Sequence, residues 1–225
     1  MKILKNKFLF FLFFYFITAS LYAQVNDAGL WTSINIDKKI SKKFSISLSE
    51  EIRFNENISE MGSIFTDAGI NYKINKIIRI SGNYRFINKR RIDDSYSQRH
   101  RYYFDFSIRT KFQYFTLMFR TRYQSQYKDI YSSPDGNVAE NYIRNKLTIK
   151  YELDKKWSFY GSFEMFSPLR TYDKILFDNL RYNAGIEYSI NKMHSIDLSY
   201  LIQKEYNVKN PWTDYVICVG YNFSF

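Results

Sequence analysis

The sequence is poor in the residues on which many folds and sites depend. Its 225 residues include one cysteine, Cys218, so no internal disulfide can form. The only histidines are His100 and His194, and no Cys/His cluster has the spacing of a metal site. No glycine-rich phosphate loop is present either. We therefore expect neither a metal nor an organic cofactor.

Long apolar runs are missing after residue 17, since no later segment approaches the roughly 18 apolar residues of a membrane-spanning helix. The one apolar run, residues 8–17, follows three lysines at positions 2, 5 and 7. It is too short to span a bilayer as a helix, which disfavours an uncleaved anchor. The pattern predicts a signal peptide over residues 1–23, cut after Ala23, and an exported domain over 24–225.

Aromatic residues and positive charge are abundant. Tyrosine and phenylalanine each occur 21 times, and the formal net charge is +11. The positive charges are spread singly along the chain, and export excludes an intracellular nucleic-acid partner. We expect membrane lipids and anionic lipopolysaccharide to be the partners of such a charge.

From about residue 28 onward, apolar and polar residues alternate with a period of two. In segment 43–54, apolar side chains share one face, serines with Glu51 and Arg53 share the other, and only Glu50 breaks the pattern. Strict alternation of this length predicts β-strands, and a tilted strand needs about 9–11 residues to cross a bilayer. The predicted strands are 28–37, 43–54, 63–74, 78–88, 99–112, 115–127, 140–153, 157–166, 178–190, 194–206 and 212–225.

The connections between these strands are alternately tight and long. The tight turns share a weak repeat, Ile74-Asn75-Lys76, Leu153-Asp154-Lys155 and Ile190-Asn191-Lys192, with Ile36-Asp37-Lys38 as an expected fourth copy. Asn and Asp suit short hairpin turns. The longer polar links are 55–62, 89–98, 128–139, 167–177 and 207–211. Such asymmetry is typical of an outer-membrane barrel with its short turns in the periplasm.

Aromatic residues near the strand ends favour the same interpretation. Tyr72, Tyr151, Trp157, Tyr188, Tyr127 and Trp212 occupy positions expected of interfacial girdles. The last strand ends with Tyr221, Phe223 and Phe225 on one face, which resembles the signal that the barrel-assembly machinery recognises.

The predicted fold is all-β, a single transmembrane antiparallel β-barrel of about 10–12 strands preceded by a cleaved signal peptide, in the outer membrane of a Gram-negative bacterium. Counting from segment 43–54 gives an even barrel of ten strands. Segment 28–37 is then an extra one: an odd strand, a segment inside the lumen, or the sign of an undetected twelfth strand.

A set of loose motifs in a fixed order resembles the uncharacterised outer-membrane family called domain of unknown function 2490. The resemblance covers essentially the whole mature chain. It implies the barrel fold and the outer-membrane location, and it carries no established activity and no catalytic residues. The motifs are Gly29-Leu30-Trp31, Glu51-Ile52-Arg53, Gly69 to Lys76, Tyr84-Arg85, Arg99-His100-Arg101 and Arg120-Thr121-Arg122-Tyr123.

The phase of the strands places many charges inside the barrel. One interpretation is a narrow pore that prefers anions and passes a small solute. The other is a sealed structural or surface-interaction barrel whose lumen is filled by a salt-bridge network, because small barrels hold only their own side chains. The lumen-lining candidates are Arg53, Glu51, Arg85, Arg101, Asp105, Arg109, Arg120, Arg122, Arg144, Arg181 and Glu187.

A lipid-modifying enzyme that uses His100 is a third hypothesis. His100 lies at the outer end of a strand near Ser95 and Ser97, but its phase faces lipid whereas that of Asp105 faces inward. We therefore expect no enzyme activity. His194 is expected at the membrane interface.

Two groups of loop residues have weaker signals. The loop acids Asp129, Asp135 and Glu140 fit no calcium-loop spacing. Arg90 and Arg91, near the outer rim, are candidates for contact with lipopolysaccharide phosphates, and a solvated loop is the alternative.

Overall fold

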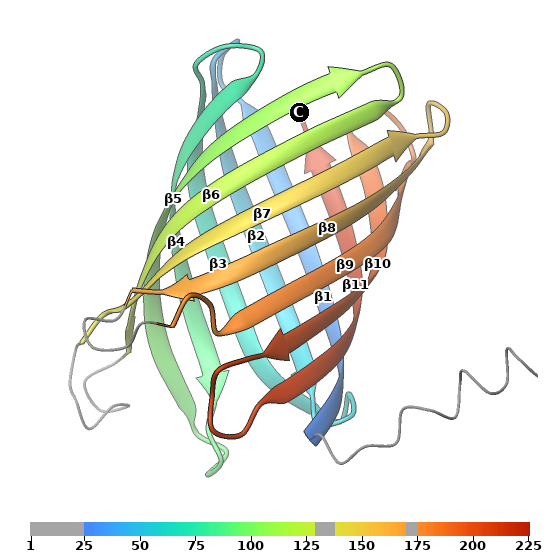
Figure 1. Cartoon of the computed structure of the whole chain (residues 1–225). Helices are drawn as coiled ribbons and strands as arrows, with labels where there is room; N and C mark the ends of the chain where they lie inside the picture. Colours follow the sequence, from blue (N-terminus) through green and yellow to red (C-terminus); the bar gives the residue numbers. More distant parts are fainter. Residues whose placement is uncertain (1–24, 129–137, 170–174) are drawn as a thin grey trace, which may run out of the picture.

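Eleven β-strands close into a barrel in the computed structural model, which describes residues 25–128, 138–169 and 175–225 (Figure 1). The expected signal peptide lies outside these residues. The strands are β1 (Val25–Lys39), β2 (Phe44–Asn55), β3 (Glu60–Lys73), β4 (Ile78–Arg90), β5 (Tyr96–Phe112), β6 (Phe115–Lys128), β7 (Glu140–Glu152), β8 (Trp157–Pro168), β9 (Asn179–Ser189), β10 (His194–Glu205) and β11 (Trp212–Ser224).

Each strand coincides with one of the predicted alternating segments, so the β assignment is confirmed. Alternation puts apolar side chains on the outside of the barrel, where many remain exposed, such as Phe104 at 64% and Ile70 at 61%. A soluble protein rarely leaves so continuous an apolar surface uncovered. The exterior is therefore that of a transmembrane barrel, with aromatic and aliphatic side chains facing lipid. Within the described ranges, no helix is long and apolar enough to cross a membrane.

The barrel closes through a parallel pair. Every other neighbouring pair of strands is antiparallel, whereas β1 runs parallel to β11, with Val25 opposite Trp212 and Asp37 opposite Ser224. An even barrel of ten strands is thus wrong, and the odd-strand alternative for segment 28–37 is confirmed. The physical reason is that β1 bonds to both β2 and β11, which leaves no free edge.

Parallel closure places the start of β1 at the long-loop end of the barrel, opposite the C-terminus (Figure 1). A side chain ties this start to a neighbouring loop. The Asp27 carboxylate accepts hydrogen bonds from the backbone N–H groups of Glu56 at 3.0 Å and Asn57 at 2.8 Å, both in the link between β2 and β3. These two loop residues have positive φ angles of 52° and 57°, so the carboxylate supports an otherwise unfavourable backbone.

Four tight turns are built alike. In three of them a side-chain oxygen of Asn75, Asp154 or Asn191 accepts from the N–H groups two and three residues later, at 2.7–3.0 Å. The bonds from Trp157 and Lys156 lower the pKa of Asp154. The fourth copy was misplaced by the prediction, because Ile36-Asp37-Lys38 lies within β1. Its role falls to Ser41, whose hydroxyl accepts from the N–H groups of Lys43 at 3.2 Å and Phe44 at 3.0 Å.

Cross-strand aromatic pairs surround the tight-turn end. Phe44 packs on Tyr72 and Trp157 on Tyr188, with ring centroids 4.7 and 4.6 Å apart. At the C-terminus, Phe223 stacks on both His194 and Phe225. The predicted girdle is present at this end, and the pairs add stability beyond the apolar area that they cover.

The parallel seam can be tested by cross-linking. Thr32 and Val219 are register partners on its outer face. Neighbouring strands lie about 4.8 Å apart, within the Cα separation that a disulfide tolerates. In a background with Cys218→Ser, we expect Thr32→Cys with Val219→Cys to lose its free thiols on mild oxidation, as measured by thiol labelling.

The matched control is Ile34→Cys with Val219→Cys, which is offset by two residues and lies beyond the roughly 7 Å limit. Folded protein that keeps both thiols free in the Thr32–Val219 variant would contradict the parallel closure.

Candidate functional site: the charged lumen

The register places all of the candidate lumen residues on the inner face of the barrel. Arg101, for example, is opposite Arg85 and Gln126, and Asp105 is opposite Ser81 and Arg122. They do not form one cluster. Most lie in a layer across the middle of the lumen, whereas Arg109 and Glu187 lie nearer the tight turns.

One half of the layer is organised around Glu164 on β8. Its carboxylate is 2.6 Å from the guanidinium of Arg120 on β6, 2.9 Å from that of Arg144 on β7 and 3.8 Å from that of Arg181 on β9. Glu164 is only 2% exposed. A carboxylate buried this deeply needs charged partners to offset its lost hydration, and three arginines supply them.

The other half contains two further carboxylates. Asp67 on β3 accepts from Arg85 at 2.5 Å and from the Tyr103 hydroxyl at 2.7 Å. Asp105 on β5 binds Arg122 in a bidentate pair at 2.6 and 2.7 Å. Planar forks of this kind fix the orientation of both side chains.

Aromatic rings join the two halves. The guanidinium of Arg53 lies 3.5 Å from the ring centroid of Trp31 and also contacts Phe65, while Arg144 lies 4.1 Å from that of Phe166. The guanidinium of Arg181 lies 5.2 Å from the same Trp31 ring centroid. These are cation–π contacts that need no counter-charge. We call the whole set the arginine layer: Arg53, Arg85, Arg101, Arg120, Arg122, Arg144 and Arg181, with Glu51, Asp67, Asp105 and Glu164.

The inward aromatic residues were missed by the sequence reasoning. Trp31, Phe65, Tyr103 and Phe166 occupy the polar phase of their strands, where large rings are unexpected in an open channel. Their phase was the available signal. It was overlooked because aromatic residues were assigned to the interfacial girdles.

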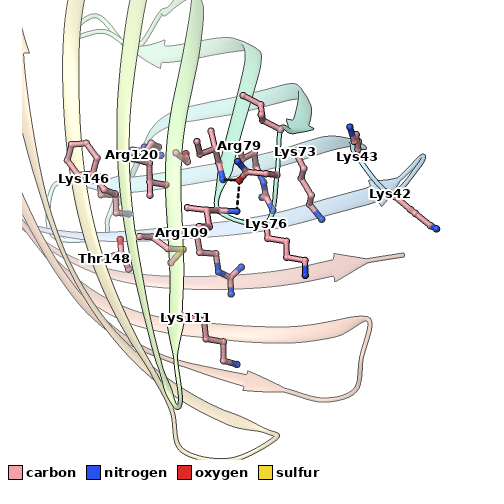
Figure 2. A pocket seen from close by; sticks show the side chains of 18 residues that line it. Lys42, Lys43, Lys73, Lys76, Arg79, Arg109, Lys111, Arg120, Lys146 and Thr148 are labelled. Carbon is pink, nitrogen blue, oxygen red and sulfur yellow. Dashed lines mark hydrogen bonds between the residues drawn. The ribbon is translucent and has the colours of Figure 1, made fainter.

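Between the arginine layer and the tight turns lies a cavity of about 730 Å³ that we call the cationic vestibule, and Figure 2 shows the side chains that line it. Its walls come mainly from β3 to β7, and no carboxylate is among the side chains that line it. Serine, threonine and asparagine supply the other polar groups. The lining cations are Lys42, Lys43, Lys73, Lys76, Arg79, Arg109, Lys111, Arg120 and Lys146.

The residues around His100 are not brought together as a catalytic set. The His100 Nδ1 atom lies 2.8 Å from the Tyr84 hydroxyl, and its ring packs on Phe86 on the lipid-facing side. Ser97 is buried on the inner face, and the Asp105 carboxylate is held by Arg122. His194, on the outer face at the tight-turn end, contacts the Tyr221 hydroxyl.

The loop candidates are only partly described. Arg90 is held by Asp94 at 2.6 Å and by Glu60 at 3.3 Å, so its guanidinium is already paired within the loops. Asp129 and Asp135 lie outside the described residues, and Glu140 pairs with Lys128 at 2.6 Å. Among the residues that are described, no group of three potential ligands gathers to hold a metal ion.

A closed barrel with an apolar exterior and a charged interior defines a protein of the outer-membrane barrel class. The chain belongs to the family described as "Protein of unknown function (DUF2490)", whose model matches residues 28–214. No curated protein matches it.

Solved structures show similarity at the level of the fold. The NanC porin is 12% identical, with a TM-score of 0.57 over 88% of this chain and 98% of that one. The translocator domain of the autotransporter NalP from Neisseria meningitidis is 14% identical over 83% and 76% of the two chains, with a TM-score of 0.48. The β domain of the Bordetella autotransporter BrkA is 10% identical over 83% and 86%, with a TM-score of 0.49.

Removal of the Glu164 charge should destabilise the barrel. Glu164→Gln leaves the buried Arg144 and the half-buried Arg120 and Arg181 short of a counter-charge, and breaking a buried pair typically costs about 3–5 kcal/mol. We expect a loss of this order in the free energy of unfolding, measured by urea titration in lipid vesicles with gel mobility as the readout.

Glu152→Gln is the matched control. It removes one carboxylate whose partner Lys111 is half exposed, so we expect a loss of at most about 1 kcal/mol. Equal losses in both variants would show that the Glu164 cluster contributes no special stability.

Proposed function

We propose that the protein is a narrow, anion-preferring pore of the bacterial outer membrane. The observation that carries this proposal is the cationic vestibule, a cavity of about 730 Å³ whose charged lining is entirely positive. A cleft lined by charge of one sign and surrounded by a low-dielectric wall concentrates counter-ions. An anion entering from the tight-turn end therefore meets a favourable potential.

The arginine layer acts as the constriction of this pore. Arginines outnumber carboxylates in it, so its net charge favours anions as rings of Arg and Lys do in anion-selective channels. Bidentate pairs and cation–π contacts hold the guanidinium groups in place, which keeps the constriction small. The likeness to a porin supports the fold and adds nothing on selectivity.

A sealed structural barrel is the second candidate. It is favoured by the low exposure of the layer, 2% for Glu164 and 7% for both Arg122 and Arg144. In that case the ion pairs serve only to hold the strands together. An enzyme role for His100 has less support, because His100 lies on the outer face, whereas the Asp105 carboxylate lies on the inner face and is held by Arg122.

The surroundings that we propose for the barrel follow from its surface. Lipid chains contact the exposed apolar exterior, and lipopolysaccharide lies at the loop end, where the half-buried Arg91 is the remaining candidate for contact with its phosphates. The aromatic end of β11 is the segment that we propose the barrel-assembly machinery recognises, through Tyr221, Phe223 and Phe225.

Single-channel recording in a planar bilayer tests the pore directly. The refolded protein is first checked for a change in gel mobility on boiling. We then expect small, stable current steps. In a salt gradient, the reversal potential should lie closer to the equilibrium potential of chloride than to that of the cation. A silent bilayer with properly folded protein would favour the sealed barrel.

Selectivity should depend on the vestibule. Arg109→Glu with Lys146→Glu reverses two charges of the vestibule lining. We therefore expect the reversal potential to shift toward the equilibrium potential of the cation. The control is Lys155→Glu with Lys156→Glu, which reverses two exposed charges on a turn at the same end, outside the lining. A shift of the same size in the control would assign selectivity to general surface charge.

A further inference from the structure

One wall of the vestibule brings cations together in pairs. Lys73 on β3 is the direct cross-strand partner of Arg79 on β4, and Arg120 on β6 is the partner of Lys146 on β7. Each pair is on the inner face, with Cβ atoms about 4.5–5.5 Å apart, where like charges destabilise a sheet. Arg109 on β5 lies between the two pairs.

The arginine layer contains a similar pair that is neutralised. Arg122 and Arg144 are also cross-strand partners, but Asp105 binds the first and Glu164 the second. Of the five vestibule cations in the preceding paragraph, only Arg120 is paired with a carboxylate among the described residues, that of Glu164. Within the described part of the chain, no carboxylate comes within 4.0 Å of the charged nitrogens of Lys73, Arg79, Arg109 or Lys146.

The remaining polar side chains of this wall are donors as well. Ser107 and Thr148 line the cavity beside the cations, and their hydroxyl groups can donate to an oxyanion. Arginine presents a planar fork that matches phosphate and carboxylate groups, and lysine adds a mobile point charge. The cavity of about 730 Å³ is within the usual size range of small-molecule sites.

We infer that this wall, Lys73, Arg79, Arg109 and Lys146, is a binding site for an oxyanion that carries two or more negative charges. Glu164 is the cross-strand partner of Lys146 on its other side, but its carboxylate already pairs with Arg120 and Arg144. A monovalent ion can contact only one or two of the four cations, whereas adjacent phosphate or carboxylate groups can contact more of them. The inference rests on the same vestibule as the proposed pore, but binding here requires no current. It also gives the pore a preferred class of solute, multivalent over monovalent anions.

Binding is measured by calorimetry on the refolded full chain in a zwitterionic detergent, with sodium pyrophosphate, citrate and acetate in separate titrations. We expect pyrophosphate, citrate or both to bind saturably and at least about tenfold more tightly than acetate. The binding should weaken as sodium chloride is raised, because salt screens the charges. The phosphate and carboxylate titrations show which chemical class the wall prefers.

Lys73→Gln with Arg79→Gln should weaken binding of the tighter ligand by roughly tenfold or more, since two charge-assisted contacts are lost. Removing opposed like charges should not unfold the barrel, and gel mobility before and after boiling checks this. Arg109→Gln alone is a second variant that leaves both cross-strand pairs intact. Lys155→Gln with Lys156→Gln is the control, and we expect its affinity to be unchanged.

The outcomes separate this inference from the proposed pore. Saturable multivalent binding with no current would support the site and overturn the pore. Anion-selective current without such binding would leave the pore standing and overturn the site. An equal loss of affinity in the Lys155–Lys156 control would also overturn it, because general surface charge would then account for binding.

Discussion

The structure depends on one constraint: a strand that crosses hydrocarbon cannot leave its backbone hydrogen bonds unmade. Ten antiparallel pairs satisfy this for most of the barrel, and the parallel pairing of β1 with β11 completes it. Once the number of strands is odd, the first and last must run in the same direction. The start of β1 at the long-loop end follows from this closure and from no local sequence signal.

Closure also determines the chemistry of the interior. Strict alternation sends every second side chain inward, and in a barrel of this size those side chains meet across the lumen. Where carboxylates are among them, as at Glu164 and Asp105, the arginines are paired and ordered. Nearer the tight turns, no carboxylate lines the cavity, and of its nine lining cations only Lys111 and Arg120 are in an ion pair within the described residues, so the same geometry leaves a lining with a positive excess. One lumen thus contains an arginine layer that carboxylates hold in place and a cationic vestibule that none of them lines.

The candidate site was predictable in composition but not in arrangement. The phase of each strand identified inward residues such as Arg122 and Arg181, because side-chain direction follows from a period of two. The phase does not predict which of these inward side chains contact one another. Arg181 on β9 contacts Glu164 on the neighbouring strand β8 and Trp31 on β1, three strands away in the other direction. These contacts depend on strand tilt and register around the whole barrel. The inward rings of Phe65 and Phe166 were missed for a different reason: their phase predicted an inward position, but aromatic residues were assigned to the interfacial girdles.

By itself the sequence determined the strands, their inner and outer faces, and three of the four similar turns, since alternation and Asn or Asp at a turn act over a few residues. Tertiary structure decided the rest. The turn at Ser41 was displaced from Asp37 because β1 extends to Lys39, which is still paired with Ser45 of β2. The strand number, the parallel seam and the division of the lumen are likewise products of closure, which joins residues nearly two hundred positions apart. No local pattern encodes a contact at that separation.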